Sequence, residues 1–167
     1  MAHTAIDILK EAILLEKQGK AFYINVAEKT DSPAAKKIFF MMAEEEEEHI
    51  KFLSKQFTNY DKSQAFITPE GFEKPAEYEA SLAVLTGQMR KEISAASFEA
   101  AAITAAMDFE KRAVKLYKDR SIEAIDPNEK EIYKMLYQWE MEHEKMLHEL
   151  SEDLKEAIWN DNNFWAF

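Results

Sequence analysis

The sequence predicts an all-α fold, and three observations support this. Only 3 Gly and 4 Pro occur among 167 residues, too few for the frequent turns of a β-sandwich or barrel. Ala, Glu, Lys, Leu and Met, which are strong helix formers, dominate the composition. Apolar residues recur at steps of three and four along four long stretches, the spacing of amphipathic helices in a bundle. We therefore expect one domain, residues 1–167, built as a four-helix bundle.

The first two helices are predicted to form a hairpin over about residues 4–58. The first helix covers residues 4–29, and the second begins at Ser32-Pro33 and ends near residue 57. Ser32 suits the N-cap because its hydroxyl accepts a backbone hydrogen bond, and proline is favoured at the first helical position.

A second hairpin is predicted over about residues 97–158. Its first helix begins near Ser97, and its second opens at Asp126-Pro127 with Glu129 in a capping-box position. An aromatic-rich tail, residues 159–167, follows. It is expected to fold back over the bundle end or to cover a dimer seam.

The segment between the hairpins, about residues 59–96, is too long for a simple loop in a bundle. It contains two Pro and two Gly, so we interpret it as a crossover that runs along the bundle. Its second half, residues 78–93, has the pattern of a short additional helix.

The two hairpins are copies of one pattern. An offset of 94 residues aligns residues 12–56 with the second hairpin without a gap. Such self-similarity indicates a repeated structural unit, and a crossover along the bundle would relate the copies by a two-fold axis. Positions that coincide include Glu16 with Glu110, Tyr23 with Tyr117, Glu46 with Glu140, and His49 with His143.

Six potential metal ligands lie on the inward faces of the predicted helices. Two Glu-x-x-His pairs place a carboxylate and an imidazole one turn apart on one helix face. A single glutamate lies on the inward face of each remaining helix. All six are near the middle of their helices and are expected to converge: Glu16, Glu46, His49, Glu110, Glu140 and His143.

Four carboxylates without partners would be prohibitively costly to bury. Two divalent metal ions would resolve this, and the oxygen and nitrogen donors suit iron or manganese, with zinc also possible. This ligand pattern is that of the di-iron and di-manganese helix bundles. The alternative from the residues alone is an acidic bundle whose Glu and His side chains are solvated or paired with Lys.

Four segments carry a resemblance to rubrerythrin-like proteins of the ferritin superfamily. The first hairpin contains LEKQGKAFY at residues 15–23 and AEEEEEH at residues 43–49; the second contains FEKRAVKLY at residues 109–117 and EMEH at residues 140–143. The resemblance implies a ferritin-like bundle with two iron ions. Glu46 and Glu140 would bridge them, Glu16 and Glu110 would be terminal ligands, and His49 and His143 would each bind one iron.

The implied function is an oxidoreductase that reduces hydrogen peroxide or dioxygen, and the alternative is a ferroxidase that feeds iron storage. The chain lacks the Cys-rich rubredoxin module of many relatives, having no Cys. Electrons would therefore come from an external donor such as a rubredoxin-like protein. The family's extra third-helix glutamate is also absent, since Met107, Ala113 and Val114 lie one turn from Glu110. A homodimer is expected.

Charge and cysteine content exclude several classes of function. The net charge of −11 argues against a nucleic-acid partner, and the absence of Cys excludes disulfides, iron–sulfur clusters and thiol nucleophiles. No apolar run is long enough to span a membrane, and the first ten residues lack a signal-peptide pattern. We therefore expect a cytoplasmic protein with no membrane partner.

Two tyrosines and a glutamate run surround the predicted ligands. Tyr23 and Tyr117 lie two turns beyond Glu16 and Glu110 and are expected to donate hydrogen bonds to ligand carboxylates. The alternative is two core tyrosines with other partners. Within residues 44–48, only Glu46 is expected to point inward.

Overall fold

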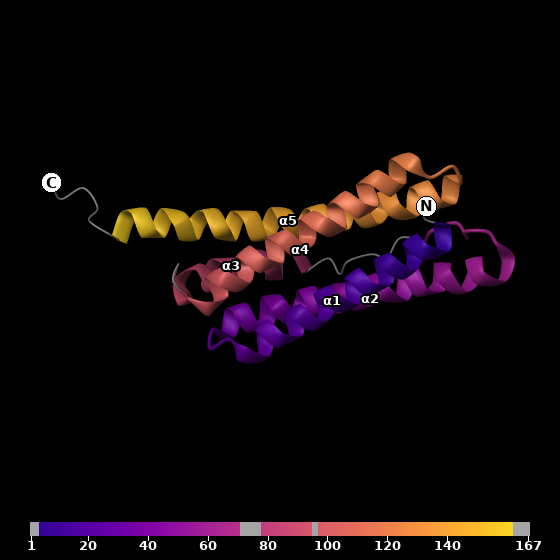
Figure 1. The fold of residues 1–167 in the computed structure, drawn as a ribbon. Coiled ribbons are helices and arrows are strands. Elements are labelled where there is room, and N and C mark those ends of the chain that lie inside the picture. The colour runs from indigo at the N-terminus through magenta and orange to yellow at the C-terminus, as the bar shows by residue number, and fades with distance from the viewer. Residues whose placement is uncertain (1–3, 71–77, 95–96, 162–167) are drawn as a thin grey trace.

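A computed structural model describes residues 4–70, 78–94 and 97–161, and in this part of the chain it contains five α-helices and no strand. The all-α prediction is confirmed (Figure 1). None of the described helices has both the length and the apolar character that crossing a membrane requires. The helices are α1 (Ala5–Lys29), α2 (Pro33–Ser63), α3 (Tyr78–Glu92), α4 (Phe98–Glu123) and α5 (Pro127–Asp161).

Four of these helices form the bundle as two hairpins, α1 with α2 and α4 with α5. Figure 1 shows that α1 and α4 run in opposite directions, as do α2 and α5. The helices α1 and α4 have nearly equal lengths, 25 and 26 residues. This is the arrangement expected when a two-fold axis across the bundle relates two copies of one hairpin.

Side-chain caps fix where the bundle helices begin. Ser32 accepts a hydrogen bond from the Ala35 backbone NH at the start of α2, and Ser97 does the same for α4. Asp126 accepts from the backbone NH of Glu129 at 3.0 Å. The carboxylate of Glu129, expected in a capping box, instead accepts from Arg120 at 2.7 Å, because that cation lies on the facing end of α4.

Two helices extend beyond their predicted ends. The helix α2 continues from the expected residue 57 to Ser63, because its last turns still have packing partners: the Tyr60 and Phe66 rings lie 4.7 Å apart. It stops where Gln64 adopts a left-handed conformation with φ of 55°. The helix α5 reaches Asp161, so the tail expected from residue 159 begins as helix, and residues 162–167 lie outside the described part.

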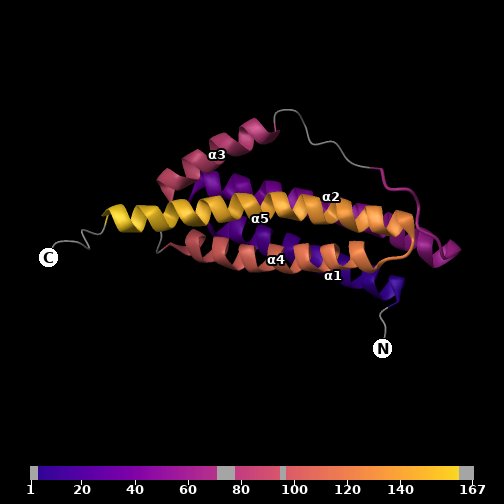
Figure 2. The ribbon, with the colours of Figure 1, turned by 90° about the horizontal axis from the view of Figure 1, so that it is seen from above.

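The crossover is anchored along the bundle in its described part. The Gln56 side chain pairs with the backbone of Ile67 through two hydrogen bonds of 3.1 Å. Phe66 is buried. The crossover then leads to α3, which lies outside the bundle against α2 and α5 (Figure 2). There the Glu92 carboxylate accepts from the backbone NH of Ala34, at the first turn of α2.

The apolar core is divided into two clusters. One surrounds the α1–α2 turn and includes Ile38, Phe39 and Leu147, and the other lies toward the opposite end of the bundle and includes Leu9 and Leu136. All six predicted ligands fall between the two clusters along their helices. The helix ends are therefore held by hydrophobic contact, and a buried polar layer occupies the middle.

Gly19 of α1 allows the two hairpins to approach closely. A Cβ atom at this position would lie 2.8 Å from Cε1 of Phe109, the residue before Glu110. We predict that Gly19→Ala lowers the free energy of unfolding by about 1 kcal/mol, because overpacking outweighs the gain in helix propensity. Denaturant unfolding measures this.

Gly87 of α3 is the matched control, since a Cβ there would have no atom within 4 Å. Gly87→Ala should raise the stability by about 0.5–1 kcal/mol. Equal effects at the two positions would contradict the packing role of Gly19.

Candidate metal centre

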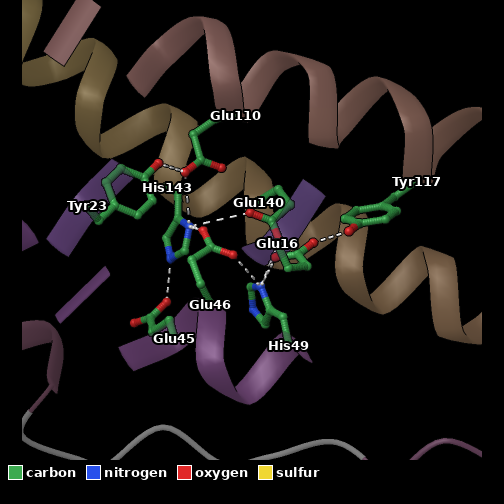
Figure 3. Close-up of polar contacts among 9 residues, drawn as sticks. All are labelled: Glu16, Tyr23, Glu45, Glu46, His49, Glu110, Tyr117, Glu140 and His143. Carbon is green, nitrogen blue, oxygen red and sulfur yellow. Dashed lines mark hydrogen bonds and ion pairs between the residues drawn. The ribbon is translucent and has the colours of Figure 1, made fainter. Parts of the chain in front are cut away.

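The structure brings all six predicted ligands together in the middle of the bundle (Figure 3). The helices α1 and α4 each provide one glutamate, and α2 and α5 each provide a Glu-x-x-His pair. Every one of the six residues is at most 3% exposed: Glu16, Glu46, His49, Glu110, Glu140 and His143.

The six residues form two overlapping groups of four. One group consists of Glu16, Glu46, His49 and Glu140; the other consists of Glu46, Glu110, Glu140 and His143. Within each group, one potential ligand atom from each residue lies within 4.8 Å of all the others. Glu46 and Glu140 belong to both groups. The geometry therefore offers two adjacent cation positions that share these two carboxylates.

Both histidines direct Nδ1 toward the carboxylates. His49 Nδ1 lies 2.9 Å from Glu140, 3.2 Å from Glu16 and 3.4 Å from Glu46. His143 Nδ1 lies 3.4 Å from Glu140, 3.5 Å from Glu110 and 3.8 Å from Glu46. Nδ1 is therefore the imidazole atom that can bind a metal ion, which leaves Nε2 to carry the proton.

Several buried polar atoms of this layer have no hydrogen-bond partner among the described residues. They include Glu46 Oε2, Glu110 Oε2 and His143 Nδ1. Buried carboxylate and imidazole atoms without partners are costly, whereas coordination to divalent cations would satisfy them. The donor set of carboxylate oxygens and neutral imidazole suits iron, manganese or zinc. The residues present thus fit a pair of metal ions.

The two buried tyrosines connect the hairpins. The Tyr23 hydroxyl of α1 donates to Glu110 of α4, and the Tyr117 hydroxyl of α4 donates to Glu16 of α1 (Figure 3). Burial and the neighbouring carboxylates raise the pKa of both tyrosines, so each remains a protonated donor. Each tyrosine therefore reaches the glutamate of the opposite repeat, one of the six predicted ligands.

Glu45 is a site residue that sequence reasoning missed. We expected only Glu46 of the run 44–48 to point inward, but Glu45 is 7% exposed and contacts His143 Nε2. The correction has a geometric reason: α2 faces α1 on one side and α5 on the other, so two adjacent positions of α2 can both be covered. The burial of Glu45 depends on the position of α5, which cannot be predicted from the spacing of apolar residues along α2.

Without metal, the charged groups of this layer perturb one another strongly. Burial, together with the charges of Glu16 and Glu140, raises the pKa of Glu46 well above its usual value. Burial also raises the pKa of Glu110, to about 7. Burial disfavours the imidazolium of His49 and His143, but the surrounding carboxylates outweigh it and raise the pKa of both. The metal-free centre therefore retains protons at neutral pH.

The fold and the site together define a ferritin-like helix bundle with a buried carboxylate–histidine centre able to bind metal. The family model described as Rubrerythrin matches residues 7–151. The chain therefore belongs to the rubrerythrin family, and the family membership implies metal binding. No curated protein and no solved structure gives a significant match to this chain.

We predict opposite pH dependences for the metal-free and metal-loaded protein. Glu110 has a pKa of about 7 in the folded state against 4.5 ordinarily. The folded state therefore binds a proton that the unfolded chain releases, and stability falls as the pH rises through this interval. The pKa values of His49 and His143 are also raised in the folded state, so the free energy of unfolding continues to fall above about pH 6.5.

The free energy of unfolding of the metal-free protein should thus fall by about 1–3 kcal/mol between about pH 5 and 8. Glu110→Gln should make this dependence shallower. Metal-loaded protein should gain stability over the same interval, because the ligands bind metal only when deprotonated. Parallel curves for the two forms would contradict a buried metal site.

Proposed function

We propose that this protein is a di-iron oxidoreductase that reduces hydrogen peroxide or dioxygen with electrons from an external donor. The observation that carries the proposal is the pair of ligand groups sharing Glu46 and Glu140. Two cations held this closely can act together on one small oxidant.

In the proposed centre, Glu46 and Glu140 bridge the two ions. Glu16 and His49 complete one position, and Glu110 and His143 complete the other, consistent with the two groups of ligand atoms. Iron bound here would supply the electrons for reduction of the oxidant. The four carboxylates would balance the charge of two divalent ions.

The protein's own residues hold this geometry in place. Tyr23 and Tyr117 each donate to a terminal glutamate, which limits the rotation of both carboxylates. The Trp139 indole stacks on His49, with ring centroids 5.2 Å apart and an interplanar angle of 11°. These contacts restrict the ligands before metal binds, so little reorganisation is required.

A cavity of about 510 Å³ between α3 and α5 supports access for a small polar substrate. Its wall includes His143 together with Arg90, Thr86 and Met146. We propose that the oxidant approaches the centre from this side. Trp139, which does not line this cavity, packs against His49 and Phe52.

The proposed electron donor is a separate protein of the rubredoxin type. The sequence contains no Cys, so this chain cannot hold the iron–thiolate centre that would deliver electrons from within. The centre lies inside the bundle, so the donor would transfer electrons through the helices. We also propose that the protein acts as a homodimer in the cytoplasm.

We predict that Glu46→Ala and Glu140→Ala each prevent binding of both metal ions, because each residue contributes to both groups. Elemental analysis after anaerobic loading with Fe²⁺ measures the metal content. Glu48→Ala and Glu142→Ala are the matched controls, since both side chains are exposed. The controls should retain two ions per chain, and an equal loss in all four variants would refute the assignment.

We predict that iron-loaded, reduced protein consumes hydrogen peroxide rapidly and does so again after each addition of reductant. Stopped-flow absorbance and a peroxide assay measure turnover, with Glu46→Ala as the inactive control. A single oxidation followed by accumulation of ferric mineral would support the ferroxidase and storage alternative instead.

A further inference from the structure

The polar residues that form the two candidate metal positions follow the internal repeat. All six ligands and both tyrosines occupy equivalent positions in the two hairpins. The reciprocal contacts Tyr23–Glu110 and Tyr117–Glu16 show that the two-fold relation extends to the hydrogen bonds. A chemical difference between the two positions must therefore come from residues that break the repeat.

One pair that contacts the two histidines breaks the repeat with a change of charge. Glu45 and Trp139 are separated by the offset of 94 residues, and each immediately precedes a shared glutamate. Each side chain also contacts the histidine of the opposite hairpin. Glu45 contacts His143 Nε2, whereas Trp139 stacks on the ring of His49 (Figure 3 shows the Glu45 contact).

We propose that Glu45 is a positioning residue that makes the two metal positions unequal, so that the His143 position binds its ion more tightly than the His49 position. The inference rests on the proposed two-metal centre. It concerns a difference in metal affinity. The ligands themselves do not produce this difference, because they are equivalent in the two repeats.

Glu45 acts on the metal through the imidazole of His143. His143 Nδ1 faces Glu46, Glu110 and Glu140, so the proton must be on Nε2 when Nδ1 binds a metal. A carboxylate accepting from Nε2–H fixes this tautomer, orients the ring and makes Nδ1 a stronger donor.

When ionised, Glu45 also adds a negative charge beyond the four ligand carboxylates. It is buried, so its charge is weakly screened. Its carboxylate touches His143, whose ring centroid lies 6.0 Å from that of His49, so the charge acts mainly on the nearer position. At the equivalent place beside His49, the Trp139 indole orients the ring by stacking and carries no formal charge.

Two variants isolate the positions in a matched way. Glu16→Ala removes a ligand from the His49 position and leaves the His143 position complete, and Glu110→Ala does the reverse. Each variant also leaves one tyrosine without its carboxylate, so the two substitutions are matched in the hydrogen bond that they remove. If an alanine variant does not fold, Glu16→Gln and Glu110→Gln are used in its place.

Calorimetric titration of these variants with Fe²⁺ under argon gives the Kd of each position. Glu16→Ala should bind one ion about tenfold or more tightly than Glu110→Ala. Adding Glu45→Gln to Glu16→Ala should weaken binding about 10–100-fold, whereas adding it to Glu110→Ala should change Kd by less than about threefold. Glu45→Asp should recover part of the loss, and Glu44→Gln, at an exposed neighbouring position, should have no effect.

The outcomes separate this inference from the proposed function. Absence of Fe²⁺ binding to the unmodified protein would overturn the metal centre itself. If the unmodified protein binds two ions but Glu16→Ala and Glu110→Ala each bind one ion with equal Kd values, only the inequality between the positions is overturned. Equal weakening of both positions by Glu45→Gln would show that Glu45 supports the fold or the overall charge and does not act through His143.

Discussion

The burial of four carboxylates and two imidazoles in the middle of a helix bundle is the constraint on which the rest of the structure depends. A continuous apolar core would be more stable than this polar layer, since ion pairs rarely recover their desolvation cost. The chain places an apolar cluster on either side of the layer. The clusters hold the helices together. The layer between them contains the carboxylates, whose negative charges bound cations would balance.

The internal repeat explains how so many ligands reach one place. A two-fold axis across the bundle brings equivalent residues of the two hairpins face to face, so one hairpin pattern used twice produces a complete site. Glu46 and Glu140 lie between the two groups of ligand atoms and belong to both. The tyrosines follow the same symmetry, because Tyr23 and Tyr117 each bind the glutamate of the other hairpin. The site therefore forms only when both hairpins are folded together.

Departures from the repeat give the two sides of the centre different surroundings. His143 contacts Glu45 and lines the cavity beside α3, whereas His49 is covered by Trp139. The crossover contributes to this difference because α3 has no counterpart in the second hairpin. A symmetric ligand set thus occupies an asymmetric environment, in which His143 has Glu45 and the cavity beside it and His49 has Trp139.

The sequence by itself determined the all-α fold, the two hairpins and the six residues that converge. These features depend on residue spacing along the chain. Examples are the spacing of Glu46 and His49, the caps at Ser32 and Ser97, and the offset that relates Glu16 to Glu110. Only the tertiary structure decided which side chains meet across helices. It placed Glu45 against His143, paired Glu129 with Arg120 and directed each tyrosine to the opposite hairpin. The physical reason is that such contacts depend on the rotation and separation of packed helices, which periodicity along one helix does not specify.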